Sequence, residues 1–183
     1  MLSNFWVAPF EINGARWNSV EHLFQGYKIN LADPTAGFNF SLNCGSPLSR
    51  SGGDEAQKNR KLRVLTFEQL QQWEGMKDTI MKAGLYAKFS QNNDLRKVLL
   101  ATQDAELWHG AARTAPSRQY LLEQVRSELS PILISIDQIQ ALLQNGQIRN
   151  FEMGTLPTFY DKSGKMYVVQ ARYDSRTNQL FPL

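Results

Sequence analysis

Hydrophobic side chains recur every three or four residues along most of the first 130 positions. This spacing predicts helices over 20–30, 66–83, 85–89, 94–102 and 117–129. The stretch 85–89 follows Gly84, so it is either a kinked continuation of the preceding helix or a new short one. Ser19 and Thr66 precede two of these helices and are expected to cap them, and Pro131 ends the last.

Strand patterns are short and lie at the two ends of the chain. Residues 10–12 and 15–17 flank Asn13-Gly14, a dipeptide that accepts the positive φ angles of a tight hairpin. The stretch 41–53 is rich in Gly, Ser and Pro and is predicted to be a loop.

The pattern changes after Pro131. We expect one helix over 132–144, a turn at 145–146, and a β-hairpin that joins 156–159 to 166–173, followed by a turn and a short end strand. The predicted fold class is therefore α+β, with a mostly helical body over 1–130. Residues 131–183 form an appendage of one helix and a β-hairpin, expected to pack on the same domain.

Composition narrows the class of protein. Hydrophobic residues make up 42% and charged residues 20% of the 183 positions, which is ordinary for a folded globular domain and argues against disorder. Cys44 is the single cysteine, so no internal disulfide forms, and with two histidines a Cys/His zinc site is nearly excluded. No stretch has the length of a membrane span or the form of a signal peptide, so we expect a cytoplasmic protein without metal or cofactor.

The net charge of +3 is compatible with a phosphate-bearing ligand or a nucleic acid. The densest basic segment, 50–63, contains five Lys or Arg residues but also Asp54 and Glu55. We favour the interpretation that this segment is a solvated loop and helix start.

The predicted helix 20–30 contains the densest group of reactive side chains. Glu21, Gln25 and Lys28 are spaced i, i+4 and i+7, so a carboxylate, an amide and an ammonium share one face of the helix. Taken alone, the pair of Glu21 and Lys28 is also common on solvated helices.

Four ordered blocks resemble the NADAR superfamily and its YbiA-like N-glycosidases. The first runs from LSNF at 2–5 through PF at 9–10 and the hairpin to SVEHLFQ at 19–25 with Lys28. The others are W-x-x-x-K-x-x-x-M at 73–81, AKFSQN at 87–92 and LLATQDAEL at 99–107. The resemblance covers residues 2 to about 130 and implies a NADAR-like glycosidase domain over 1–130.

The chain departs from the family pattern after the fourth block. The usual Asp, Trp-Gly pair and Gly-rich stretch are replaced by a shorter segment, 108–118, so one wall of the family's pocket is altered. Two alternatives follow for this segment. Either Trp108, His109 or Arg113 takes the place of the family's pocket-wall residues, or the segment is a surface loop between helices.

The resemblance implies hydrolysis of an N-glycosidic bond between a ribose and a base. Glu21 is the expected acid/base, and Lys28 the electrophile or a Schiff-base nucleophile. The expected substrate-binding residues are Asn4, Phe5, Gln25, Trp73, Lys88 and Trp108, through amide hydrogen bonds, aromatic stacking and a pyrophosphate contact. Phe89 is expected in the core, and His22, which points away from Glu21, in a structural role.

Three hypotheses follow. The first is a glycosidase for a base bearing ADP-ribose, with ADP-ribosyl-guanine in a nucleotide or nucleic acid favoured. The second keeps the reaction but takes ribosylamino-pyrimidine phosphates of riboflavin synthesis as substrates. The third is an ADP-ribose-binding module without turnover. The sequence leaves the oligomeric state open.

Overall fold

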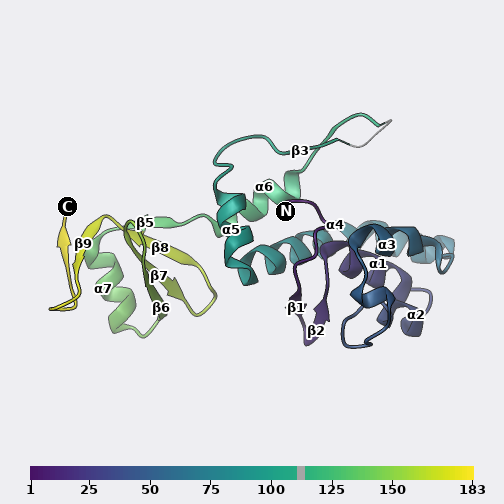
Figure 1. The fold of residues 1–183 in the computed structure, drawn as a ribbon, viewed down its shortest axis with the longest axis horizontal. Helices are drawn as coiled ribbons and strands as arrows, with labels where there is room; N and C mark the ends of the chain where they lie inside the picture. Colours follow the sequence, from purple (N-terminus) through teal and green to yellow (C-terminus); the bar gives the residue numbers. More distant parts are fainter. Residues whose placement is uncertain (111–113) are drawn as a thin grey trace. The chain divides into compact units, whose positions relative to one another are not determined.

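The computed structural model describes residues 1–110 and 114–183. These fall into two compact units, Met1–Glu128 and Leu129–Leu183, which are considered separately (Figure 1). Both units combine helices with small sheets, which confirms the predicted α+β class. Arg113, one of the residues considered for the altered pocket wall, lies outside the described residues.

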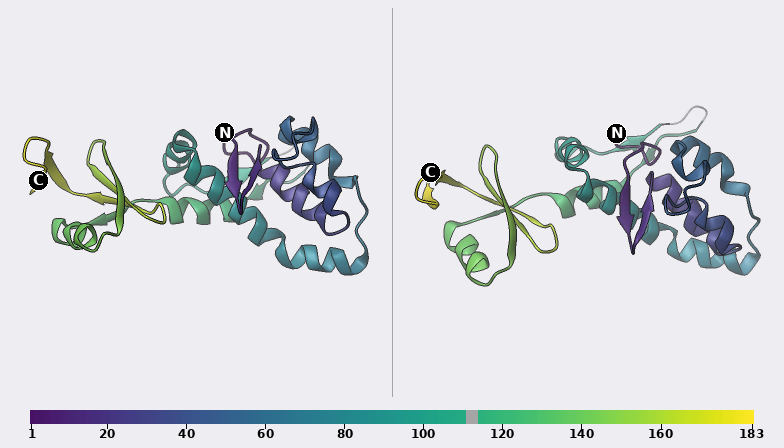
Figure 2. Two further views of the ribbon diagram at one scale, coloured as in Figure 1. Left: turned by 90° about the horizontal axis from the view of Figure 1, so that it is seen from below. Right: turned by 60° about the horizontal axis from the view of Figure 1, so that its bottom comes forward.

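Helices make up most of the first unit. They are α1 (Val20–Asn30), α2 (Pro34–Phe38), α3 (Gly53–Lys58), α4 (Phe67–Gln91), α5 (Asn93–Leu100) and α6 (Tyr120–Leu129), with short 3-10 turns η1 (Leu48–Arg50) and η2 (Asn59–Lys61). Helix α1 packs against α2, α3 and α4, and α4 is the longest helix of the unit (Figure 2). Helix α3 begins at the end of the segment predicted as a loop over 41–53, and that prediction missed η1.

The caps predicted for α1 and α4 are confirmed. The Ser19 side chain accepts a hydrogen bond from the backbone of His22, and Thr66 forms a reciprocal capping box with Gln69. Of the two alternatives at Gly84, the structure shows the continuation of the same helix, because α4 runs through Gly84 without interruption. A Cβ atom at Gly84 would lie 2.6 Å from a methyl carbon of Leu23, so the glycine permits close packing of α4 on α1.

The core of the first unit forms where α1, α4, α5 and α6 contribute apolar faces. Its fully or almost fully buried side chains include Val20, Leu23, Ile29, Phe40, Trp73, Leu85, Phe89, Leu99 and Val125. The expectation that Phe89 belongs to the core is confirmed. This packing makes α1 and α4 a rigid platform for the side chains on their remaining faces.

Two small hairpins complete the first unit. The predicted one pairs β1 (Phe10–Ile12) with β2 (Ala15–Trp17), with Asn13 and Gly14 at positive φ. The other pairs β3 (Trp108–His109) with β4 (Ser117–Arg118) and extends beside α6 (Figure 1). The helix predicted from residue 117 therefore begins only at Tyr120, because residues 117–118 are engaged as a strand.

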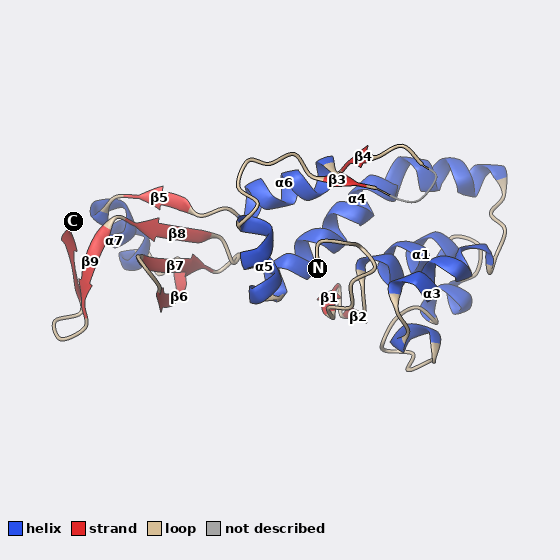
Figure 3. Ribbon diagram, turned by 45° about the horizontal axis from the view of Figure 1, so that its top comes forward, coloured by secondary structure: helices blue, strands red, loops and turns tan. Residues whose placement is uncertain are grey.

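The second unit contains a four-stranded sheet in the order β5-β8-β7-β6 (Figure 3). The strands are β5 (Ile132–Ile134), β6 (Ile148–Met153), β7 (Pro157–Asp161) and β8 (Met166–Val169); β5 and β8 run parallel and the other pairs antiparallel. Helix α7 (Ile136–Gln144) covers one face through Ile139, which packs with Phe159 and Val169. A separate hairpin pairs β9 (Ala171–Asp174) with β10 (Gln179–Pro182).

The prediction for this region was correct in the helix and the β7–β8 hairpin and wrong in three details. Residues 132–134 are a strand, β6 was missed, and the predicted strand 166–173 is divided between β8 and β9. The β-branched residues of 132–134 gain a parallel partner in β8, which local periodicity does not reveal. Within the described residues, no helix has both the length and the apolar character needed to cross a membrane.

Candidate functional site

A cavity of about 420 Å³ lies in the first unit beside the start of α1. Its lining comes from the N-terminal segment (Leu2, Ser3, Asn4, Phe5), from α1 (Glu21), from α3 (Gln57), and from the β3–β4 hairpin and α6 (Leu107, Trp108, His109, Gln119, Leu122). This volume suits one nucleoside-sized group. Among the described residues that line the cavity, Glu21 is the single carboxylate, and amide and aromatic side chains also contribute to the lining.

Glu21 is held in place by a second side chain of the same helix. It is only 5% exposed, and Gln25 Nε2 donates a hydrogen bond to its Oε1 across 2.8 Å. Burial raises the pKa of Glu21 above its ordinary value of 4.5, while the Gln25 hydrogen bond and the charge of Arg60 act in the opposite direction. A cavity-lining carboxyl group whose proton is stabilised in this way is suited to acid/base chemistry.

The N-terminal segment lies across the start of α1 and brings Asn4 and Phe5 to the cavity. The backbone N–H of Glu21 donates to the Asn4 carbonyl at 3.1 Å, which satisfies one of the free donors in the first helical turn. Gly53, the first residue of α3, packs on the same segment, since a Cβ there would lie 2.3 Å from Phe5 Cα. The N-terminal segment is thus held by α1 through Glu21 and by α3 through Gly53.

The AKFSQN block holds the same segment from the end of α4. Lys88 is completely buried, and its Nζ donates to the carbonyls of Met1 at 3.1 Å and Ser3 at 2.8 Å. Gln91 of the same block exchanges two hydrogen bonds of 2.8 Å with the backbone of Glu11 and so holds strand β1. Desolvation lowers the pKa of Lys88 to about 8. The predicted pyrophosphate contact of Lys88 remains untested, but its ammonium group is engaged with backbone carbonyls and it does not line the cavity.

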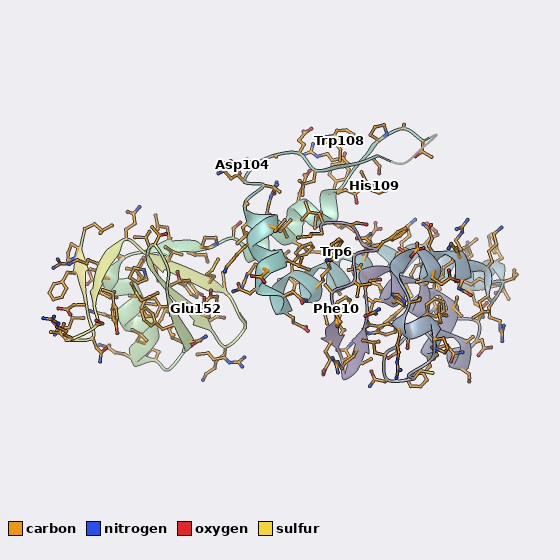
Figure 4. The ribbon with its side chains drawn as sticks, in the orientation of Figure 1. Trp6, Phe10, Asp104, Trp108, His109 and Glu152 are labelled. Atoms are coloured by element: carbon orange, nitrogen blue, oxygen red, sulfur yellow. The ribbon has the colours of Figure 1, made fainter. Side chains whose placement is uncertain are left out.

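The described residues of the altered segment include strands β3 and β4, and this hairpin contributes one wall of the cavity. Figure 4 shows Trp108 and His109 on this hairpin, and both line the cavity. Glu123 of α6 accepts the Leu107 N–H at 2.8 Å and binds Arg118 Nη2 at 3.0 Å. These contacts fasten both strands of the hairpin to α6.

Hydrogen bonding holds the Trp108 ring in one orientation, although the residue is 57% exposed. Its Nε1 donates to Glu106 at 3.2 Å, and the other oxygen of Glu106 contacts Arg118 Nη1 at 2.7 Å. The indole face is therefore available as a stacking surface at the cavity while its polar edge is satisfied.

His22 has the structural surroundings that its position predicted. Its imidazole is fully buried and contacts the Ser19 hydroxyl at 2.8 Å and the Leu48 carbonyl at 3.0 Å. Burial lowers the pKa of His22, which favours the neutral ring. The side chain joins α1 to η1 and lines none of the described cavities.

The structure brings four of the eight predicted site residues to the cavity: Asn4, Phe5, Glu21 and Trp108. Gln25 does not line the cavity but donates a hydrogen bond to Glu21. Lys28 lies two turns farther along α1, about 10 Å along the helix axis from Glu21, and is not among the lining residues. Trp73 is buried and packs edge-on against Phe24, with ring centroids 4.7 Å apart.

Sequence reasoning missed Gln57 and Gln119, which complete the polar lining. Gln57 belongs to the segment 50–63, which was interpreted as solvated. The Lys and Arg side chains of that segment are indeed exposed. Gln57 was missed because only the packing of α3 in the folded unit brings its amide to the cavity. No group of three or more His, Cys, Asp or Glu side chains suited to a metal ion occurs in the described part of the chain.

The fold and site define an α+β protein with one buried carboxyl group in a nucleoside-sized cavity, walled by amides and an exposed indole. In comparison with known families, residues 1–114 match the NADAR domain. N-glycosidase YbiA of Escherichia coli (strain K12) is 30% identical over 142 residues, an alignment that covers 70% of this chain and 81% of that protein.

Other comparisons agree. N-glycosidase YbiA of Shigella flexneri serotype 5b (strain 8401) is 31% identical over 58% of this chain and 59% of that protein. The NMR structure of the E. coli protein YbiA has a similar fold, with a TM-score of 0.52 and 22% identity over 81% of this chain and 82% of that one. The chain belongs to the NADAR family and is an N-glycosidase, a class of hydrolase.

Proposed function

We propose that this protein hydrolyses the N-glycosidic bond between a base and the ribose of an ADP-ribose unit, with Glu21 as the acid/base residue. The observation that carries this proposal is the position of Glu21. It is the single carboxylate among the described residues that line the cavity, it is buried, and it is oriented by Gln25. A buried carboxylate is unfavourable beside the phosphates of an anionic nucleotide, which supports a role for Glu21 at the sugar–base bond.

The chemistry follows from the raised pKa of Glu21. In its protonated form the carboxyl group donates a proton to the departing base as the bond between C1′ and nitrogen breaks. The resulting carboxylate then stabilises the positive charge at C1′ and accepts a proton from the water whose oxygen bonds to that carbon. The products are the free base and a ribose hydroxyl, and Glu21 returns to its protonated form.

The lining supplies groups for both parts of such a substrate. The amides of Asn4, Gln57 and Gln119 offer donors and acceptors to ribose hydroxyls and base edges. Phe5 and Trp108 offer faces on which a base can stack. Exposed Arg60 and Lys61 follow Gln57 along the chain, which supports a substrate that carries phosphate, including ADP-ribosyl-guanine within a nucleic acid.

Lys28 is retained in the proposal as the second functional group predicted from the family resemblance, either as an electrophile or as a Schiff-base nucleophile toward the opened ribose. It lies on the same helix as Glu21 but outside the cavity lining. Of the two assignments, the geometry supports Glu21 more strongly.

The test is product analysis by mass spectrometry. Wild type, Glu21→Ala and Lys28→Ala are incubated separately with an oligonucleotide that carries ADP-ribosyl-guanine and with ribosylamino-pyrimidine phosphates. We expect wild type to release ADP-ribose and restore the oligonucleotide, and Glu21→Ala to lose this activity. Glu68→Ala, a change at an exposed glutamate on α4, is the matched control.

Each outcome decides between the hypotheses. Turnover of the pyrimidine phosphates alone would transfer the proposal to that substrate class. ADP-ribose binding without release of any base would indicate a binding module. Full activity of Glu21→Ala would refute the assigned acid/base residue, and full activity of Lys28→Ala would remove Lys28 from the mechanism.

A further inference from the structure

Met81 is the last residue of the W-x-x-x-K-x-x-x-M block, and the proposed function gives it no role. It lies on α4, is half-buried, and lines a second cavity, of about 450 Å³, that also has Asn4 in its wall. Asn4 lines the cavity of Glu21 as well, whereas Met81 does not. A contact between Met81 and Asn4 can therefore affect the cavity of Glu21 although Met81 does not reach it.

This contact is a hydrogen bond with a defined direction. Asn4 Nδ2 donates to Met81 Sδ across 3.3 Å. A thioether sulfur carries no hydrogen and only accepts, so it binds the nitrogen of the amide and not the carbonyl oxygen. Met81 thereby fixes which side of the Asn4 amide faces α4.

The carbonyl oxygen of the Asn4 side chain is left for a ligand. Within the part of the chain that the structure describes, Asn4 Oδ1 accepts no hydrogen bond. Asn4 is half-buried and lines the cavity beside Glu21, so an acceptor with two lone pairs is available there. The ligand group that matches it is a donor, a hydroxyl or an N–H.

The backbone of Asn4 relates this acceptor to Glu21. The Asn4 backbone carbonyl accepts the Glu21 N–H at 3.1 Å, and α4 and α3 hold the residues on either side of Asn4. The hydrogen bond to Met81 restrains the side chain in addition. Asn4 Oδ1 and the Glu21 carboxyl group are therefore presented to one ligand in a defined relation.

The ribose hydroxyl next to the scissile bond matches this acceptor. Glu21 acts at C1′ in the proposed reaction, and the adjacent carbon carries the 2′-hydroxyl. As positive charge develops at C1′, the 2′-hydroxyl becomes more acidic, so the hydrogen bond that it donates strengthens in the transition state. An oriented acceptor beside Glu21 thus accelerates the reaction more than it tightens substrate binding.

We infer that Met81 is a positioning residue, which binds the nitrogen of the Asn4 amide and so keeps Asn4 Oδ1 available for the 2′-hydroxyl of the ribose. The inference rests on the proposed function, because Glu21 places C1′ in this cavity. Met81 acts through Asn4 and does not itself touch the substrate.

The test compares a ribosyl substrate with its 2′-deoxyribosyl analogue, which has the same base. Met81→Leu keeps the apolar volume and removes the sulfur acceptor, so the Asn4 amide is free to rotate. We expect the ratio of kcat for the ribosyl to the deoxyribosyl substrate to fall about tenfold in Asn4→Ala, the effect of one hydrogen bond made in the transition state, and at least about threefold in Met81→Leu. KM for the ribosyl substrate should change less than kcat.

The ratio cancels the intrinsic difference in reactivity between the two sugars, which is the same in every variant. It also cancels a general loss of activity from disturbed packing, since such a loss affects both substrates. Met76→Leu is the matched control, because Met76 is a half-buried methionine of the same helix that lines none of the described cavities. Its ratio should stay within about twofold of wild type.

NMR of the Asn4 side-chain amide tests the contact without turnover. We expect its Nδ2 resonances to shift in Met81→Leu and to stay in place in Met76→Leu. Unmoved resonances, or an unchanged kcat ratio, in Met81→Leu would overturn the inference even if Glu21 proves essential. Full activity of Glu21→Gln would instead overturn the proposed reaction, and a reduced ratio in Met81→Leu would still support the contact with Asn4.

Discussion

Gln25 Nε2 donates a hydrogen bond to Glu21 Oε1 across 2.8 Å, one turn along α1, and both side chains are 5% exposed. Within the described residues, Gln25 Oε1 has no hydrogen-bond partner. The amide therefore serves chiefly to orient the carboxyl group and to stabilise its ionised form. This contact opposes the burial that favours the protonated form, so Gln25 tunes the proton affinity of Glu21.

The first prediction concerns the pH dependence of catalysis. If Glu21 is the general acid, activity falls as pH rises through its pKa. Gln25→Met removes a hydrogen bond that lowers this pKa, so the descending limb should move to higher pH. The measurement is a pH–rate profile of kcat for both proteins. Gln72→Met, at an exposed position of α4, should leave the limb unmoved, and an unmoved limb in Gln25→Met would contradict the assignment.

The second prediction concerns stability. Because burial raises the pKa of Glu21, the folded state binds this proton more tightly than the unfolded state, and wild type loses stability as pH rises from 4.5 to the raised value. Glu21→Gln has no such proton, so its unfolding free energy relative to wild type should increase over that window and then level off. Urea unfolding at a series of pH values measures the difference, and a pH-independent difference would argue against the raised pKa.

The third prediction concerns Trp108. Trp108→Ala should raise KM about 5- to 150-fold, the range for loss of one base-stacking contact of ~1–3 kcal/mol. Its stability should stay within about 0.5 kcal/mol of wild type, because the ring is exposed. Trp108→Phe should retain most of the affinity. The control is Trp6→Ala, a change at another exposed tryptophan that lines none of the described cavities (Figure 4). Equal effects on KM at both positions would show that Trp108 has no specific role.

The fourth prediction concerns the ion pair beneath the hairpin. Glu123→Gln weakens the attachment of Arg118 and Leu107 to α6, so we expect a higher KM and faster hydrogen exchange at the Leu107 amide. Arg118 lowers the pKa of Glu123 below its ordinary value of 4.5, so the wild-type attachment is present above pH 4.5 and is lost as pH falls through the lowered pKa. Glu55→Gln, on α3, is the control. Unchanged Leu107 exchange in Glu123→Gln would mean that the hairpin is held by other contacts.

The fifth prediction concerns Lys88. Lys88→Met removes the ammonium donor from the Met1 carbonyl and one of the two donors from the Ser3 carbonyl, and we expect a loss of about 1–3 kcal/mol in unfolding free energy at pH 7. The Trp6 amide, which donates to Ser3, should exchange faster, and activity should fall because the same segment presents Asn4.

The pH dependence of Lys88 has the opposite sign to that of Glu21. Between its folded pKa of about 8 and its ordinary value of 10.5, the unfolded state binds the proton that the folded state has released, so wild-type stability rises relative to Lys88→Met across this window. Lys97→Met, at an exposed lysine of α5, should show neither this trend nor the change in exchange. A parallel pH trend in both variants would contradict the assignment.

The sequence by itself determined the local elements of the first unit. Periodicity placed α1 at residues 20–30, and Ser19, Thr66 and Asn13-Gly14 marked caps and a turn, because these depend on a few adjacent residues. The family resemblance pointed to Asn4, Phe5 and Glu21, and Trp108 was a candidate from the segment that departs from the family pattern; all four line one cavity.

Only the tertiary structure decided which side chains meet. Lys88 and Trp73 lie in blocks that resemble the family, as Asn4 and Glu21 do, yet the packing of α4 turns Lys88 toward the N-terminal carbonyls and Trp73 toward Phe24. Strand β5 and the β3–β4 hairpin were missed because a strand is stabilised by a partner distant in sequence, and no local pattern shows that partner. Burial, which raises the pKa of Glu21, likewise depends on the N-terminal segment and α3, which the fold places against α1, and not on the residues beside Glu21 in the sequence.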